Sequence, residues 1–172
     1  RAALMSVAGQ DEAGHTLRGL LESCGIESLL QTDPSIKTIV KLRIIARQQQ
    51  MLRADFENAP TSEVLAAILG AFEKEVSRAD AVVLSDYGKG GLNHIRQMIA
   101  RAREENVPVL IDPKGSDYAR YKGATLITPN RAELALVVGG WSSEEELRSK
   151  AHKLREELEL QALLLTRSEE GM

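Results

Sequence analysis

Apolar residues recur at the spacing i, i+3, i+4, i+7 in four stretches of the chain, and each stretch predicts an amphipathic helix. The four stretches are residues 11–25, 61–76, 93–102 and 142–160. The first has Asp11 as its N-cap and Gly25 as its stop. The last carries Ser143 and Glu146 at the spacing of a capping box.

Short apolar runs separate these stretches and predict strands. They are residues 3–7, 81–85, 107–112, 124–128 and 162–166, each bounded by turn residues. The runs are apolar on both faces, as strands of a parallel sheet covered by helices on both sides are. The alternation of strands and helices therefore predicts a doubly wound α/β fold.

Residues 36–56 have a different period. Lys37, Lys41, Arg43 and Arg47 share one parity, and the residues between them are mostly apolar. This alternation predicts a half-exposed β ribbon with a basic face, inserted before the α/β part at about 61–172. An edge strand protected by lysines is an equally good interpretation.

Composition narrows the class of protein. The 172 residues are 43% hydrophobic and 27% charged, with a formal net charge of −3, which suits a globular domain and gives no overall basic field for nucleic acid. No run approaches the roughly 20 apolar residues of a membrane span. The single cysteine cannot form a disulfide framework, so we expect a cytoplasmic location. From the net charge and the lack of a long apolar run we expect neither nucleic-acid nor membrane partners.

Polar turns follow the last four predicted strands, with the sequences SDYGKG, DPKG, TPNRAE and TRSEEG. The carboxyl ends of parallel strands lie at one edge of a sheet, where ligands bind. Lys89 and Lys114 stand on glycine-containing turns that suit an anion such as phosphate. Taken singly, SDYGKG and DPKG also suit ordinary tight turns, and Asn130 with Glu133 also suits a helix cap.

These turns, together with KLRIIARQQQMLRADFE, resemble those of the ribokinase-like (phosphofructokinase-B) sugar kinases. The resemblance is closest to the heptose 7-phosphate kinase domain of the bifunctional heptose kinase/adenylyltransferases. It implies a ribokinase-like, mostly parallel sheet with a small β lid at about 36–56. It also implies an ATP-dependent kinase that produces heptose 1,7-bisphosphate for ADP-heptose and lipopolysaccharide core biosynthesis.

The resemblance implies roles for particular residues. Asn130, Arg131, Ala132 and Glu133 match the nucleotide site, and Glu133 and Asn130 match the pair that orders Mg²⁺, mostly through water. Thr166, Ser168 and Gly171 match the turn along the nucleotide phosphates, although many relatives have glycine where Ser168 stands.

Four cations match positions that bind phosphate or sugar. Lys89 and Lys114 would neutralise phosphate charge, on either ATP or the sugar phosphate. Arg47 and Arg53 lie in the part of the family that closes over the sugar, and a cationic lid suits an anionic substrate. The ribbon could equally form a homodimer contact.

One motif of the family is absent. The catalytic base is the aspartate of a Gly-Ala-Gly-Asp turn, which this sequence lacks, so we expect no catalytic residue in the chain and place the base beyond Met172. The opening strand and Gly-Gly sugar motif of the family are missing as well. Residues 1–172 are therefore expected to be the central part of one sugar-kinase domain, inactive alone, whose parent could carry a fused adenylyltransferase.

Two other functions remain open. One is a kinase of the same fold for another sugar, which the preferred sugar phosphate would reveal. The other is a non-catalytic module that binds a nucleotide or sugar phosphate.

Overall fold

The computed structural model describes residues 1–172, which divide into two compact units. Unit 1 is Arg1–Ala71 with Lys89–Gly91, and unit 2 is Phe72–Gly88 with Leu92–Met172. Helix α2 (Ser62–Glu75) contains the point of division. No helix combines the length and the apolar composition that crossing a membrane requires.

Unit 1 opens with two short strands that pair in parallel with two strands on the far side of a helix in the sequence. β1 (Ala3–Leu4) pairs with β3 (Glu27–Ser28), and β2 (Val7–Ala8) pairs with β4 (Gln31–Thr32) in the same register. The expected strand 3–7 is thus present in two pieces, and its partner strand was missed. Helix α1 (Glu12–Ser23) connects the two sides and contributes Leu21 to a small core with Ala8 and Leu30.

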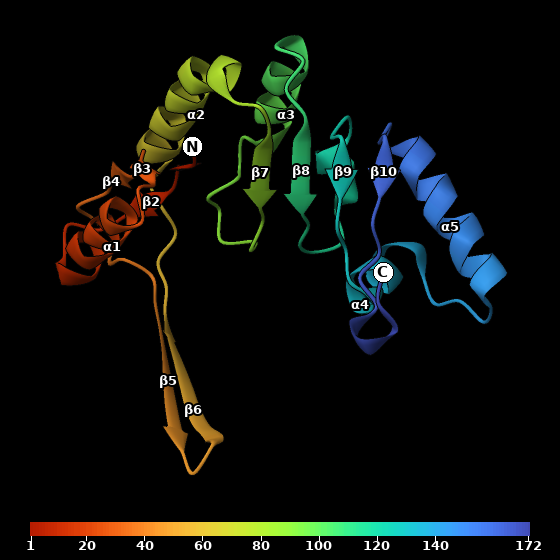
Figure 1. Ribbon diagram of the computed structural model, residues 1–172, viewed down its shortest axis with the longest axis horizontal. Coiled ribbons are helices and arrows are strands. Elements are labelled where there is room, and N and C mark those ends of the chain that lie inside the picture. Colours follow the sequence, from red (N-terminus) through yellow and green to blue (C-terminus); the bar gives the residue numbers. More distant parts are fainter. The chain divides into compact units, whose positions relative to one another are not determined.

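The ribbon of unit 1 consists of β5 (Val40–Ala46) and β6 (Gln49–Phe56), paired antiparallel with a register shift between Ile44 and Ile45. Figure 1 shows it as a hairpin extending from the rest of its unit. Arg47 and Gln48 both have positive φ, 47° and 66°, as a two-residue hairpin turn requires.

The expectation of a half-exposed ribbon is wrong, because every residue of β5 is exposed and so is every residue of β6 except Ala54. Unit 1 provides no second layer for the apolar face.

Unit 2 contains a four-stranded parallel sheet in the order β10-β9-β8-β7. Its strands are β7 (Val82–Ser85), β8 (Val109–Asp112), β9 (Leu126–Ile127) and β10 (Ala162–Leu163). Figure 1 shows the four arrows side by side, with α5 next to β10. The parallel sheet expected from the apolar runs is confirmed.

Three helices and one 3₁₀ turn connect these strands, and two further 3₁₀ turns lie before β7 and after β10. The helices are α3 (Ile95–Glu104), α4 (Arg131–Val138) and α5 (Glu144–Glu157). The turns are η1 (Val76–Arg78), η2 (Tyr118–Tyr121) and η3 (Ser168–Glu170). Strand and helix side chains together form the core, which includes Ile95, Ile99, Val109, Ile111, Ile127 and Leu134.

The capping box expected at α5 forms only in part. The Ser143 hydroxyl accepts from the Glu146 amide, as expected. The Glu146 carboxylate, however, accepts from the amide and hydroxyl of Ser142 rather than from Ser143. Lys150 one turn later, together with these donors, lowers the Glu146 pKa to about 2.

Candidate functional site

The carboxyl ends of the four strands in unit 2 lead directly into the polar turns that the sequence singled out. Asp86 follows β7, Lys114 follows β8, Asn130 follows β9 and Thr166 follows β10. In a parallel sheet these ends share one edge, which is where α/β folds bind ligands.

A buried carboxylate, Asp86, connects two of these turns. It accepts from the Gly88 amide at 2.8 Å and from the Tyr121 hydroxyl at 2.8 Å, and Arg120 lies 3.4 Å away. The Tyr121 hydroxyl also accepts from the Lys114 amide at 3.0 Å. Burial is the main reason that the pKa of Tyr121 rises to about 12, so its hydroxyl stays protonated and keeps donating. The network fixes the backbone on which Lys114 stands.

Lys114 and Glu133 form an ion pair, with Nζ 3.2 Å from Oε1. The second carboxylate oxygen of Glu133 accepts from the Asn130 amide at 3.0 Å, and the Asn130 side chain accepts from the Glu133 amide at 3.0 Å. This reciprocal pair is a capping box at the start of α4. The interpretation of the TPNRAE turn as a helix cap is therefore correct. The other oxygen of Glu133, Oε1, remains beside the Lys114 ammonium group.

The turn after β10 lies against the turn after β9, because Asn130 and Thr166 form a parallel bridge. Arg131 is paired with Glu170 at 2.8 Å, which links the start of α4 to η3. Gly171 has a φ of 84°. Ser168 has a φ of 55°, a left-handed conformation that costs a serine more than a glycine.

Arg167 is tied to both neighbouring acids. It binds Glu144 through two hydrogen bonds of 3.0 and 2.7 Å, and it binds Glu170 at 2.6 Å. These carboxylates hold the pKa of Arg167 above its usual value. The guanidinium is thus a fixed cation beside the turn that carries Ser168.

The remaining candidate cations belong to unit 1. Lys89 forms an ion pair with Glu57, the residue that follows β6, and Lys41 lies 3.9 Å from the same carboxylate. Arg53 pairs with Asp55 at 3.0 Å, and Arg47 occupies the hairpin turn. Lys89, one of the two lysines expected to bind phosphate, is therefore paired with a carboxylate, as Lys114 is.

The structure brings together one set of candidates within unit 2: Lys114, Asn130, Arg131, Glu133 and Thr166, with Ser168 and Gly171 on the adjoining turn. The exposed side chain of Ala132 adds no polar atom to it. In unit 1, Arg47, Arg53 and Lys89 lie on the ribbon and on the glycine turn.

The side-chain oxygens of Asn130 and Glu133 suit a Mg²⁺ ion that is bound mainly by phosphate oxygens and water. No group of three or more histidine, cysteine, aspartate or glutamate side chains that could hold a metal ion occurs in residues 1–172. Each Glu133 oxygen has one partner and keeps a second lone pair, so the carboxylate could still accept a hydrogen bond from a water of a hydrated ion.

Sequence reasoning missed three carboxylates. Asp33 and Glu57 were not singled out, and Asp11 was interpreted only as a helix cap. A sequence signal existed for one of them, because Gly9, Asp11 and Gly14 form a Gly-x-Asp-x-x-Gly motif directly after a strand.

The full sequence, residues 1–172, matches the pattern that defines the pfkB family carbohydrate kinases. The chain belongs to the pfkB family of carbohydrate kinases.

Relatives of this pfkB chain include a D-beta-D-heptose 7-phosphate kinase of Bordetella bronchiseptica, which is 47% identical over 169 residues. The bifunctional protein HldE of Haemophilus influenzae is 50% identical over 172 residues, and that of Pasteurella multocida is 49% identical over 172 residues. Each alignment covers 98% of this chain. The chain spans 54% of the Bordetella protein and 36% of the two HldE proteins.

Solved structures confirm the ribokinase-like fold. The ribokinase of Giardia lamblia matches with a TM-score of 0.78 and 16% identity over 97% of this chain and 54% of its own. Phosphofructokinase-2 of Escherichia coli, in complex with fructose-6-phosphate, matches with a TM-score of 0.71 and 16% identity over 96% of this chain and 56% of its own. The pfkB chain thus has a partial ribokinase-like α/β fold.

Proposed function

We propose that the protein containing this chain is an ATP-dependent heptose 7-phosphate kinase that produces heptose 1,7-bisphosphate for ADP-heptose and lipopolysaccharide core synthesis. One observation carries the proposal. The chain is 47–50% identical, over nearly its whole length, to a protein named D-beta-D-heptose 7-phosphate kinase and to two proteins named HldE. The phosphate-compatible cluster at the sheet edge of unit 2 supports it.

In this reaction the C1 hydroxyl oxygen attacks the γ-phosphorus of ATP, the bond to the β–γ bridging oxygen breaks, and ADP leaves. A base takes the hydroxyl proton, and the chain holds no Gly-Ala-Gly-Asp turn to supply it. The residues of unit 2 would then provide charge and positioning, which is most of what phosphoryl transfer needs. Lys114 and the turn from Thr166 to Gly171 would lie along phosphates, with Asn130 and Glu133 ordering hydrated Mg²⁺.

The ribbon of unit 1 would act on the sugar side. Arg53 and Arg47 are cations on a hairpin, and a guanidinium binds a phosphate with two parallel hydrogen bonds. Lys89 would serve the same anion after exchanging its partner Glu57.

Partners and location complete the proposal. The exposed apolar face of the ribbon, with Leu42, Ile44, Leu52 and Phe56, would be covered by a second copy in a homodimer, which sedimentation of the full-length protein would detect. The two HldE relatives are named bifunctional, which supports a fused adenylyltransferase.

A cytoplasmic location fits the exposed single thiol of Cys24.

The test is ATP consumption by the full-length protein with heptose 7-phosphate and a panel of other sugar phosphates, beside the 172-residue chain alone. We expect preference for heptose 7-phosphate and activity in the full-length protein only. Preference for another sugar would replace the substrate. Inactivity with every sugar would favour a binding module.

A further inference from the structure

The β5–β6 ribbon is supported only at its base. Its residues are exposed along both strands apart from Ala54, so packing within unit 1 does not set its direction. A strand rises about 3.3 Å per residue, so the ribbon is about 23 Å long and a rotation of about 10° at its base moves its tip by about 4 Å. Within one chain, the contacts at the two stems therefore determine where the tip lies.

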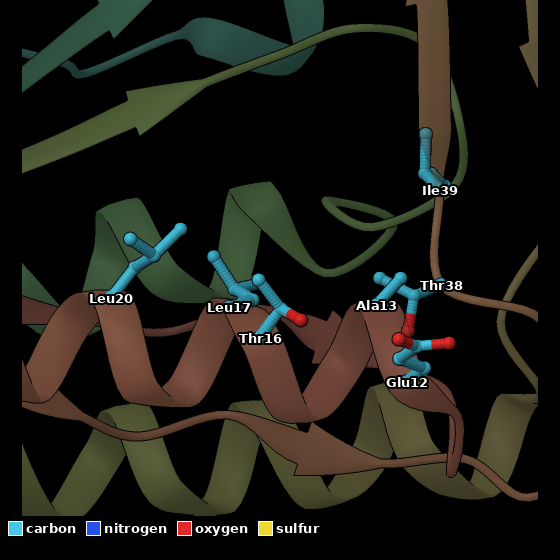
Figure 2. A pocket seen from close by; sticks show the side chains of 7 residues that line it. All are labelled: Glu12, Ala13, Thr16, Leu17, Leu20, Thr38 and Ile39. Carbon is cyan, nitrogen blue, oxygen red and sulfur yellow. The ribbon is translucent and has the colours of Figure 1, made fainter.

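One carboxylate holds the first stem. Asp11 accepts from the amide and the hydroxyl of Thr38 at 2.8 and 2.6 Å. It also accepts from the Gly14 amide at the start of α1, at 2.9 Å. The Thr38 hydroxyl in turn accepts from the Gly9 amide at 2.9 Å. Thr38 is 8% exposed and lies two residues before β5, and Figure 2 shows it beside the first turn of α1.

A second carboxylate holds the other stem. Asp33, which is 1% exposed, accepts from the Thr61 amide at 3.0 Å, and Thr61 directly precedes α2. Its other oxygen accepts from the amide and hydroxyl of Ser35 at 2.9 and 2.5 Å. Asp33 thus joins the segment that leads into β5 to the segment that leaves β6.

The backbone around the first clamp is too crowded for side chains. A Cβ on Gly9 would lie 2.5 Å from the Ile36 carbonyl oxygen, and a Cβ on Gly14 would lie 2.5 Å from the Gly9 carbonyl oxygen. Both contacts are with backbone, which cannot rotate away. The two glycines of the Gly-x-Asp-x-x-Gly motif therefore permit the close approach of the stem to α1.

We propose that Asp11, through Thr38, and Asp33, through Thr61, are positioning residues that fix the direction of the ribbon and so place its arginines for the anionic sugar. The second half of this statement rests on the proposed kinase function. Both carboxylates are ionised at neutral pH, and their hydrogen bonds lower each pKa from 3.8 to about 2, so they remain ionised in mild acid as well. Neither residue needs to touch a substrate for this role.

The test compares two threonine variants of the full-length protein. Thr38→Val keeps the shape and removes the hydroxyl, whereas Thr38→Ser keeps the hydroxyl. Thr32→Val is the matched control, because it removes a threonine hydroxyl that binds Arg18 elsewhere in unit 1. Asp33→Asn examines the second clamp and stays informative if Thr38→Val fails to fold.

The first readout is independent of activity. One nitroxide label is placed on Cys24, at the end of α1, and a second on the hairpin turn, where Gln48→Cys provides the thiol. Pulsed electron paramagnetic resonance then measures the distance between the end of α1 and the tip of the ribbon. We expect the distance distribution to broaden by about 4 Å or more in Thr38→Val and Asp33→Asn, as the lever length implies. Thr38→Ser and Thr32→Val should keep the wild-type width.

The second readout is kinetic. Thr38→Val should raise KM for heptose 7-phosphate by about fivefold to tenfold, the equivalent of one lost hydrogen bond, with KM for ATP unchanged. Unchanged distances in both variants would overturn the proposal and leave the kinase assignment intact. Broadened distances with an unchanged sugar KM would overturn the substrate-positioning role. A wild-type protein inactive on every sugar would reject the kinase function, while the distances would still decide the clamp.

Discussion

The parallel sheet of unit 2 and the ribbon of unit 1 are held by different forces. In the sheet, the side chains of Val109, Ile111 and Ile127 are buried, and strands and helices stabilise one another by excluding water. In the ribbon, large apolar side chains such as Ile45 and Met51 face solvent, and hydrogen bonds to carboxylates at the stems provide the anchorage. The same types of residue thus contribute stability in one region and little in the other.

The largest expected effect comes from removing core volume in the sheet. Ile127→Ala should lower the free energy of unfolding by about 2–5 kcal/mol, because a fully buried side chain leaves a cavity. Ile45→Ala in the ribbon, where the side chain is 64% exposed, should change it by less than about 0.5 kcal/mol. Urea unfolding of both variants measures the contrast, and equal losses would contradict it.

The next effect separates two buried tyrosines of η2, which are 2% and 0% exposed. Tyr121→Phe should cost about 1–3 kcal/mol, because buried Asp86 and the Lys114 amide lose a partner. Tyr118→Phe should be neutral or stabilising, because the Tyr118 hydroxyl has no hydrogen-bond partner. Thermal unfolding of the pair provides the comparison, and a larger loss in Tyr118→Phe would refute the assigned network.

At the cap of α4, stability and activity should change together. Asn130→Ala should cost about 1 kcal/mol through the lost cap. It should also lower turnover by about tenfold if the asparagine orders metal and phosphate. Ser143→Ala at the cap of α5 is the control, with a similar stability loss and wild-type turnover. Wild-type turnover in Asn130→Ala would remove this residue from the nucleotide site.

A smaller effect is expected at the base of the ribbon. Glu57→Gln releases Lys89 and Lys41 from a competing carboxylate, so KM for the sugar phosphate should fall by about threefold, within the energy of an exposed ion pair. The decrease should diminish at high salt. Glu27→Gln, which removes a surface pair with Arg1, should leave KM unchanged. A higher KM in Glu57→Gln would mean that Glu57 supports the anion site rather than competing with it.

The last effect is a pH dependence of the first clamp. The Asp11 pKa is lowered from 3.8 to about 2 by Thr38, the Gly14 amide and nearby Lys37. Its contribution is therefore complete above about pH 4 and disappears as pH falls toward 2. The stability difference between wild type and Asp11→Asn, measured by urea unfolding, should be constant from pH 7 to 5 and shrink below pH 4. A difference that grows on acidification would contradict the clamp.

Much of the sheet could be predicted from sequence because burial leaves a periodic pattern. Helices α1, α2, α3 and α5 and the strand-end turns follow from apolar spacing, caps and glycine stops. The sequence from Asn130 to Glu133 indicated the cap of α4, although no apolar spacing predicted that helix. The incomplete capping box at Ser143 could not be predicted, because backbone geometry decides whether the Glu146 carboxylate accepts from Ser142 or from Ser143.

The ribbon and its anchors were harder to predict, for identifiable reasons. Alternation at Val40–Ala46 gave the strand but not its exposure, since alternation reports two different faces and not what covers them. The hairpin turn at Arg47 and Gln48 lacks the usual asparagine or glycine. The bonds from Asp11 to Thr38 join residues 27 positions apart, which no local pattern encodes.

The left-handed conformation of Ser168 has an evolutionary consequence. A glycine there would relax the backbone, so drift under selection for folding alone would favour its appearance. A lineage that retains serine accepts a small conformational penalty at the turn expected to face the nucleotide.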